Sequence, residues 1–110
     1  MGGPDPIPPG MLDMLVLRTV ARMGKLHGFE IAEAIEQISE DVFRVEEGSL
    51  YPALQRLLIN GWLVGEWGRT GENRKARFYQ LTSAGRKQLE KQLTRYSRVN
   101  AAIQRILEST

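Results

Sequence analysis

The segment from Gly48 to Trp62 constrains the fold of this chain more than any other. It reads Gly-Ser-Leu-Tyr-Pro-Ala-Leu-Gln-Arg-Leu-Leu-Ile-Asn-Gly-Trp. At helical spacing one face is apolar and carries Leu50, Leu54, Leu57 and Leu58. We expect Ser49 to cap this helix, which would put Pro52 in the first turn, where backbone N–H groups lack intrahelical partners. The opposite face would then be free to contact another molecule, and it carries Ser49, Pro52, Gln55, Arg56 and Ile59.

A β-hairpin is expected directly after this helix. Two strand-like runs, residues 62–67 and 76–81, flank a polar loop that contains two glycines and reads Gly-Arg-Thr-Gly-Glu-Asn-Arg-Lys. Thr82 then stands where it would cap a long helix from Ser83 to about Ser109. An outward-facing helix followed by a basic hairpin predicts a winged helix-turn-helix with an appended C-terminal helix.

The remaining segments complete a mainly α-helical fold with a small β-hairpin. Residues 11–23 predict a largely buried helix, residues 42–45 a short strand, and Ile31, Ile35 and Ile38 the apolar face of a second helix after Gly28. We therefore expect a flexible N-terminal arm over residues 1–10, a winged-helix domain over residues 11–82 and a C-terminal helix over residues 83–110.

Composition narrows the possible functions. The chain has 110 residues, no cysteine and one histidine. This length suits one domain, and the residue types argue against disulfides, a metal site or any cofactor. No apolar run is long enough to span a membrane and no secretion signal is visible, so a cytoplasmic protein is expected. One histidine, no cysteine and no converging pair of carboxylates leave no obvious general acid, base or nucleophile, so we do not expect an enzyme.

The charge is distributed unevenly along the chain. Residues 1–47 hold four basic and nine acidic side chains, a net charge of −5, whereas residues 48–110 hold eleven basic and four acidic ones, a net charge of +7. The basic half begins with the outward-facing helix. Such a distribution is typical of a protein that binds the phosphate backbone of DNA, although solvated charge is common in any small domain.

Four blocks of this sequence resemble the PadR family of transcriptional regulators. They are Leu-Asp-Met-Leu-Val-Leu at 12–17, His-Gly-Phe-Glu-Ile at 27–31, Glu-Gly-Ser-Leu-Tyr-Pro-Ala-Leu at 47–54 and Phe-Tyr-Gln-Leu-Thr-Ser-Ala-Gly at 78–85. The resemblance implies a DNA-binding winged helix, a homodimer made by the C-terminal helix, and usually repression that a small molecule relieves. The single short C-terminal helix resembles the compact branch of the family.

Candidate DNA contacts follow from the residue types together with this resemblance. The helix that follows Gly48 would be the recognition helix, and its candidates are Ser49, Tyr51, Pro52, Gln55 and Arg56. The basic hairpin would be the wing, and its candidates are Arg69, Arg74, Lys75 and Arg77. Gln55 and Arg56 can read adenine or guanine edges in the major groove, and the wing cations can grip phosphates. The competing interpretation is an ordinary solvated surface, with Tyr51 closing the core.

The long C-terminal helix carries an apolar stripe that predicts a homodimer interface, formed by Leu89, Leu93, Tyr96, Val99, Ile103, Ile106 and Leu107. Because two such helices would bring both Tyr96 side chains near the dimer axis, this position is a candidate site for a small hydrophobic or aromatic effector. The alternative is that Tyr96 is ordinary interface packing.

Other conspicuous residues are expected to have structural roles. His27, beside Gly28 at a helix start, is expected to make a local hydrogen bond or a phosphate contact, and Trp62 and Trp67 to pack the core and the hairpin. The alternative function is a winged-helix module that binds proteins and no DNA. Such a module would show an apolar or acidic outer face, and only Ile59 fits that description.

Overall fold

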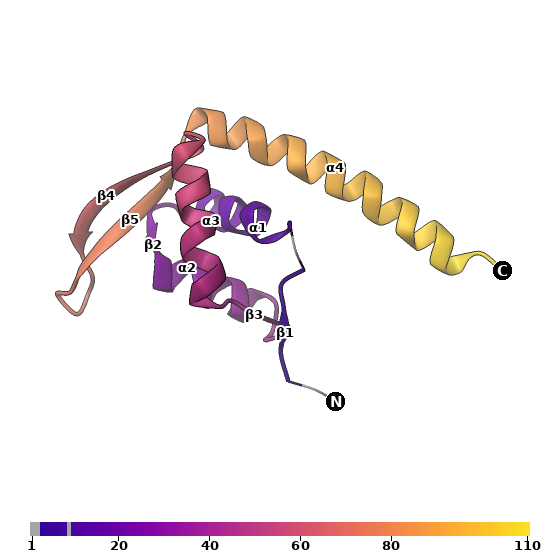
Figure 1. Ribbon diagram of the computed structural model, residues 1–110, viewed down its shortest axis with the longest axis horizontal. Helices are drawn as coiled ribbons and strands as arrows, with labels where there is room; N and C mark the ends of the chain where they lie inside the picture. The colour runs from indigo at the N-terminus through magenta and orange to yellow at the C-terminus, as the bar shows by residue number, and fades with distance from the viewer. Residues whose placement is uncertain (1–2, 9) are drawn as a thin grey trace.

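The computed structural model describes residues 3–8 and 10–110. In this part of the chain the helices are α1 (Leu12–Met23), α2 (Gly28–Ile38), α3 (Glu47–Ile59) and α4 (Ser83–Glu108). The strands are β1 (Asp5–Pro6), β2 (Leu26–His27), β3 (Phe43–Arg44), β4 (Leu63–Arg69) and β5 (Lys75–Leu81). Three helices packed together, a hairpin at one side and a long projecting helix make up the predicted winged helix with its appendage (Figure 1).

The core lies between α1, α2, α3 and the root of the hairpin. Its most deeply buried side chains come from all of these elements, and they are Val16, Leu17, Ile31, Leu54, Leu57 and Leu63. In α3 the buried residues are Leu50, Ala53, Leu54 and Leu57, so the leucine face of the recognition helix points inward as its spacing predicts.

The start of α3 differs from the expectation. Its N-cap is Glu46, whose carbonyl accepts the N–H of Leu50 at 2.9 Å, so Ser49 lies inside the first turn and is not the cap. Pro52 consequently lies beyond the first turn, where its missing N–H leaves the Gly48 carbonyl without the usual intrahelical bond. Ser49 is a residue type that often caps helices, but the backbone already turns helical after Glu46.

The wing is a regular antiparallel hairpin with a third, very short strand. β4 and β5 pair in register from Leu63 opposite Leu81 to Arg69 opposite Lys75, and β2 pairs with the other edge of β5. The strands therefore reach closer to the tip than predicted, and Arg69 and Lys75 belong to them. β2 was not predicted because two residues are too few for a periodic pattern.

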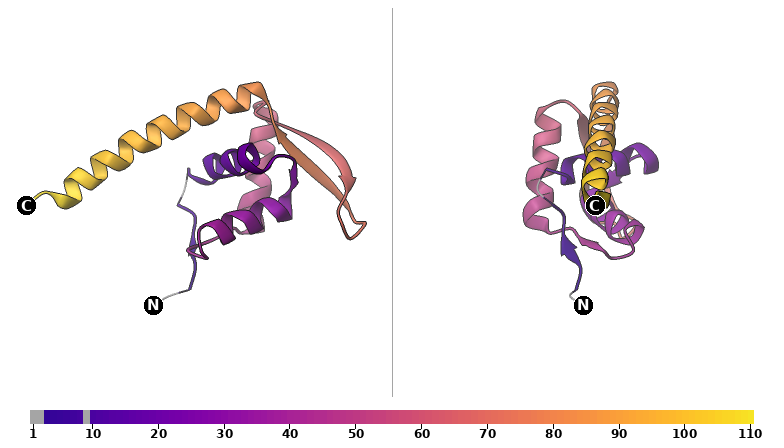
Figure 2. Two further views of the ribbon diagram at one scale, coloured as in Figure 1. Left: turned by 180° about the vertical axis from the view of Figure 1, so that it is seen from behind. Right: turned by 90° about the vertical axis from the view of Figure 1, so that its right-hand side faces the viewer.

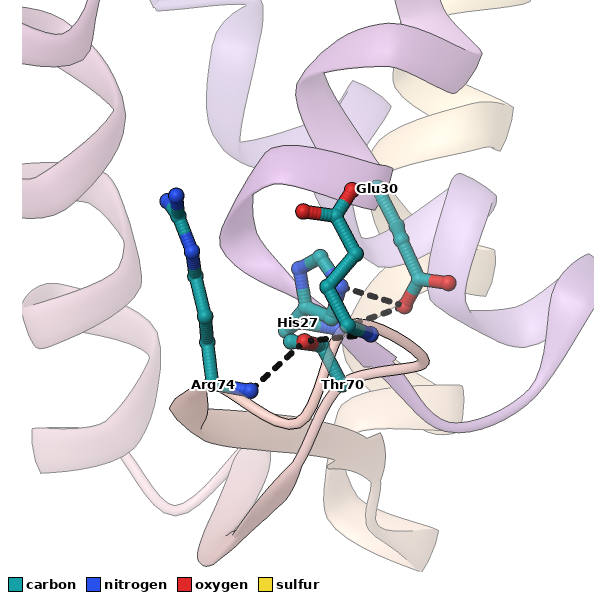
Figure 3. A network of polar contacts seen from close by, with 5 residues as sticks. His27, Glu30, Thr70 and Arg74 are labelled. Atoms are coloured by element: carbon teal, nitrogen blue, oxygen red, sulfur yellow. Dashed lines mark hydrogen bonds and ion pairs between the residues drawn. The ribbon is translucent and has the colours of Figure 1, made fainter.

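The tip of the wing is ordered by Thr70. Its Oγ1 accepts the backbone N–H groups of Glu72 and Arg74, both at 3.2 Å, and its own N–H donates to the Arg74 carbonyl at 2.9 Å. Figure 3 shows the two contacts of the Thr70 hydroxyl and the Arg74 side chain extending away from the turn. The turn thus presents Arg74 outward from a defined backbone.

Thr82 joins the wing to α4, and its predicted capping role is confirmed. Its Oγ1 accepts the N–H of Gly85 at 2.9 Å and donates to the carbonyl of Gly61 at 2.7 Å. At Gly85 the helix approaches the chain so closely that an added Cβ would lie 2.0 Å from the carbonyl oxygen of Trp62. The first turns of α4 are therefore anchored on the winged helix, while the rest projects away from it (Figure 2).

The N-terminal arm is attached over part of its length. Asp5 and Pro6 pair in parallel with β3, the Asp5 N–H donates to the Val42 carbonyl at 2.8 Å, and Ile7 packs against the core. This attachment differs from the flexible arm expected for residues 1–10, because a proline-rich segment can still extend along an exposed strand. Residues 1, 2 and 9 lie outside the described part of the chain.

Candidate nucleic-acid interface

The outer face of α3 is exposed as its helical spacing predicts. Ser49, Tyr51, Pro52, Gln55, Arg56 and Ile59 are all exposed. Tyr51 is 56% exposed and Ile59 82% exposed, so neither closes the core. This face offers a phenol, an amide and a guanidinium to a partner.

Arg56 is held by a residue of another helix. Its Nε donates to Asp13 Oδ2 at 3.2 Å and its Nη2 donates to Asp13 Oδ1 at 2.8 Å. This hydrogen-bonded carboxylate raises the pKa of Arg56 above its usual value. A guanidinium has five N–H donors, so three remain for another molecule after the paired contact with Asp13. Arg56 is thus fixed in direction while its outer edge stays available.

The face of the wing that continues the core changes from apolar at the root to basic at the tip. Side chains alternate along paired strands, so one face carries Leu63, Gly65, Trp67, Arg69, Lys75, Arg77, Tyr79 and Leu81. We call this the inner face. Leu63 and Tyr79 are buried in the core, whereas Arg69 and Lys75 are exposed beyond them.

Trp67 on the inner face is 64% exposed, which corrects the expectation that it packs the hairpin. Lys75 Nζ lies 5.1 Å and the Arg77 guanidinium 6.0 Å from the centre of its ring. Trp62, by contrast, is half-buried against the core as expected. The difference arises because the outer part of the hairpin extends away from the helices (Figure 1), so Trp67 is bordered by side chains of β5 and remains largely exposed.

Arg77 is the least accessible of the wing cations. Its side chain is half-buried and crosses Gly65, where an added Cβ would lie 2.6 Å from the Arg77 Nε. This Nε is buried without a hydrogen-bond partner in the structure. Gly65 therefore provides the space that brings the guanidinium beside Trp67, and Arg77 is less free to reach a phosphate than Arg69, Arg74 or Lys75.

Tyr79 connects the inner face to α3. Burial raises the pKa of its phenol above the usual value, the nearby charge of Arg77 opposes this rise, and Tyr51 adds to it. Since α3 also contacts β4, the end of this helix lies beside the root of the wing. Figure 1 shows the hairpin starting at the end of α3 and its tip lying apart from that helix. Both elements carry exposed side chains, which are aromatic, amide and basic on α3 and aromatic and basic on the wing.

His27 has a structural environment at the start of α2. Its backbone N–H donates to the Glu30 carboxylate at 3.1 Å, and its ring packs edge-on against Phe78 with 5.3 Å between ring centres. Figure 3 shows the contact with Glu30. Across residues 3–8 and 10–110, no group of three metal-binding side chains is close enough to hold an ion. In the same residues, no helix is both long and apolar enough to cross a membrane.

The apolar stripe of α4 divides into two parts. Leu89 is only 4% exposed and belongs to the core of its own chain, with Leu93 packed against that core. The expectation that Leu89 contacts a second copy is therefore wrong, because its side chain is already buried. Beyond these two leucines the stripe is open to solvent and comprises Tyr96, Val99, Ile103, Ile106 and Leu107, which are between 42% and 72% exposed. Helical spacing placed these residues on one stripe but did not show where α1 stops covering it.

Known proteins share this arrangement. The sequence model of the Transcriptional regulator PadR-like family matches residues 16–91, which is more than half of the chain. The chain belongs to this family. Members of the PadR-like family are DNA-binding regulators and not enzymes, in agreement with the residue types.

Individual proteins are similar to this PadR-like regulator in part of the sequence or in fold. The transcriptional regulator Rv3488 of Mycobacterium tuberculosis is 40% identical over 62 residues, which cover 56% of this chain and 54% of that protein. A transcriptional regulator from Clostridium thermocellum has a similar fold, with a TM-score of 0.82, 22% identity, and coverage of 90% of this chain and 95% of that one. A PadR family regulator from Eggerthella lenta gives a TM-score of 0.78 and 24% identity, covering 92% and 85% of the two chains.

Sequence reasoning missed three contributors to this surface. Asp13 lies 43 positions from its partner Arg56, so no local pattern connects the two residues. Gly65 and Trp67 had no pattern that could reveal the close passage of Arg77 or the exposed ring. A possible signal was the alternation along β4, which puts both residues on the face shared with Arg69.

Proposed function

We propose that this PadR-like regulator binds duplex DNA sequence-specifically as a homodimer. The outer face of α3 enters the major groove and the wing cations contact the adjacent backbone. The observation that carries the proposal is the exposure of Tyr51, Gln55 and Arg56 on α3, the helix that leads directly into a wing with the exposed cations Arg69, Arg74 and Lys75. These side chains provide hydrogen-bonding groups for base edges and positive charge for phosphates.

The open part of the α4 stripe supports the homodimer. An isolated chain would leave Tyr96, Val99, Ile103, Ile106 and Leu107 in water on a projecting helix, which favours burial against a second copy. A two-fold dimer presents two recognition helices to a palindromic operator with half-sites about one turn, roughly 10 base pairs, or a multiple apart. Such a regulator works where the chromosome is, so we place it in the cytoplasm.

Repression relieved by a small hydrophobic or aromatic effector completes the proposed function. A ligand near Tyr96, at the dimer axis, would change the angle between the two α4 helices, and the recognition helices would no longer match successive major grooves. A Tyr96→Ala protein that dimerises and loses its response to the inducer would support this site. The same variant responding normally would leave Tyr96 as ordinary interface packing.

The decisive experiment is selection of bound duplexes from a randomised DNA pool at about physiological salt, where non-specific electrostatic binding is weak. Enrichment of a two-fold symmetric sequence is the expected result. Gln55→Ala should then weaken binding to the selected site by about tenfold and hardly change non-specific binding. Gln37→Ala, an exposed glutamine on α2, serves as the matched control.

The second candidate function is a protein-interaction module without DNA binding. Ile59, 82% exposed at the end of α3, is the observation that favours it. A folded, dimeric protein that enriches no sequence and binds no duplex even at low salt would favour this alternative.

A further inference from the structure

We propose that Trp67, together with Lys75 and Arg69, forms an aromatic and cationic clamp on the wing that packs against the sugar–phosphate backbone of duplex DNA. The indole ring would cover a deoxyribose, and the two cations would bind the phosphates on either side of it. This inference rests on the proposed DNA binding and adds to it a contact that hydrogen-bonding and charged residues alone do not provide.

The position of Trp67 is the first argument. It lies opposite Arg77 in the hairpin and two residues before Arg69 on the same strand, and Arg69 lies opposite Lys75. All four side chains therefore project from the inner face. At 64% exposure, most of this large apolar ring is in contact with water. Burying it against a partner is favourable because an aromatic ring carries much of the binding energy at interfaces.

The charge around the ring identifies the partner. The inner face has no acidic side chain on either strand, and Lys75 and Arg77 lie within about 6 Å of the ring centre. The acidic residue of β4, Glu66, projects from the opposite face, where it pairs with Lys25. An apolar ring surrounded by cations alone is complementary to a surface of sugars and phosphates.

Two cations already lie beside the ring in the free protein, and these are Lys75 of the clamp and its neighbour Arg77. Lys75 packs its ammonium over the indole, so its charge is held near the ring before any DNA is present. Arg77 is held beside the ring by its passage across Gly65. The indole N–H is a further donor that can reach a phosphate oxygen. The wing is thus organised before it meets the backbone.

Binding of a mixed-sequence duplex at low salt tests the clamp, because a backbone contact does not depend on the operator. Trp67→Ala is expected to weaken this binding by about fivefold to tenfold, with the dependence of affinity on salt unchanged, since no charge is removed. Lys75→Ala should instead reduce the salt slope by about one. Val64→Ala is the matched control, because Val64 is 53% exposed on the opposite face of the same strand.

Fluorescence gives an independent readout. The chain has two tryptophans, so a Trp62→Phe protein reports on Trp67 alone. Its emission should shift to shorter wavelength or be quenched when the duplex is added. The affinity comparison does not depend on this variant, so the test stands even if Trp62→Phe lowers stability.

Each outcome decides the matter. Equal duplex binding by the wild type and Trp67→Ala, with no change in Trp67 emission, would overturn the clamp and leave DNA binding intact. If the wild type binds single-stranded DNA more tightly than duplex, and Trp67→Ala removes this preference, then Trp67 stacks on unpaired bases. That result would also overturn the clamp on duplex DNA. Failure of the wild type to bind any duplex would refute the proposed function itself, and the clamp with it.

Discussion

Replacing Gly85 by alanine should disturb the junction that directs α4. The added Cβ would lie 2.0 Å from the Trp62 carbonyl oxygen and 2.8 Å from Leu81 Cδ1. A leucine methyl can rotate away, but the carbonyl is backbone. Since Cβ atoms essentially never approach other atoms closer than 3.0 Å, the helix and the Trp62 peptide must separate by at least 1 Å.

The loss of stability can be worked out from the hydrogen bonds that this separation would weaken. Trp62 O accepts the Thr82 N–H at 3.1 Å, and Thr82 Oγ1 donates to Gly61 O at 2.7 Å. Overpacking of this kind costs about 1–3 kcal/mol, and weakening a backbone hydrogen bond adds about 1 kcal/mol. We expect a total of about 2–4 kcal/mol. For a domain of this size that corresponds to a melting temperature lower by roughly 8–16 °C.

Thermal and urea unfolding at one fixed protein concentration measure this effect, because dimerisation makes the melting temperature depend on concentration. Gly48→Ala is the control: it lies inside α3, its Cβ would meet nothing within 4 Å, and its φ is not positive. That variant should be neutral or more stable by up to about 1 kcal/mol. A Gly85→Ala protein within about 0.5 kcal/mol of the wild type would show that the junction relaxes freely and that the estimate is wrong.

Four further predictions follow from the structure. A double-mutant cycle between Asp13→Ala and Arg56→Ala should give a coupling free energy of about 0.5–1 kcal/mol in urea unfolding, and additive effects would show that the exposed pair does not stabilise the α1–α3 contact. Thr82→Ala should cost about 1–2 kcal/mol by removing the cap of α4, whereas Thr82→Ser should restore most of it; equal losses would point to the methyl group instead. Burial raises the pKa of Tyr79 in the folded protein, so its contribution to stability is complete below pH ~10, where unfolded tyrosine titrates, and is lost as the pH rises from there through the higher folded value. The free energy of unfolding measured in urea should therefore fall more steeply between neutral pH and pH ~11 for the wild type than for Tyr79→Phe. Parallel dependence of this free energy on pH in the two proteins would contradict burial of Tyr79 as the cause. Ile103→Glu should yield monomers in sedimentation experiments while Lys91→Glu, on the charged side of α4, remains dimeric; a dimeric Ile103→Glu protein would place the interface elsewhere.

Much of the fold was predictable because its local patterns are strong. The leucine spacing of α3, the alternating runs of the hairpin and the Thr82 cap each rest on interactions between residues close in the sequence. The family resemblance had the same origin, since its four blocks lie within single elements or where neighbouring elements join. The outer face of α3 and the apolar stripe of α4 could therefore be named residue by residue.

The boundaries were less predictable where two signals competed. Ser49 is a favourable capping residue, yet α3 starts after Glu46 because the short strand β3 already delivers the chain in an extended conformation. The pairing of Asp5 with Phe43 depends on where β3 ends up relative to the arm. Neither outcome can be read from propensities alone.

The sequence by itself determined the winged-helix class, the position of the recognition helix, the basic wing and the capped C-terminal helix, because periodicity and capping act over a few residues. Only the tertiary structure decided which of these side chains are free. It joined Arg56 to Asp13, laid Arg77 across Gly65, exposed Trp67 and withdrew Leu89 into the core. The physical reason is that the exposure and the partners of a side chain depend on how separate elements pack together. Local sequence patterns around one residue do not indicate which distant residue it will contact.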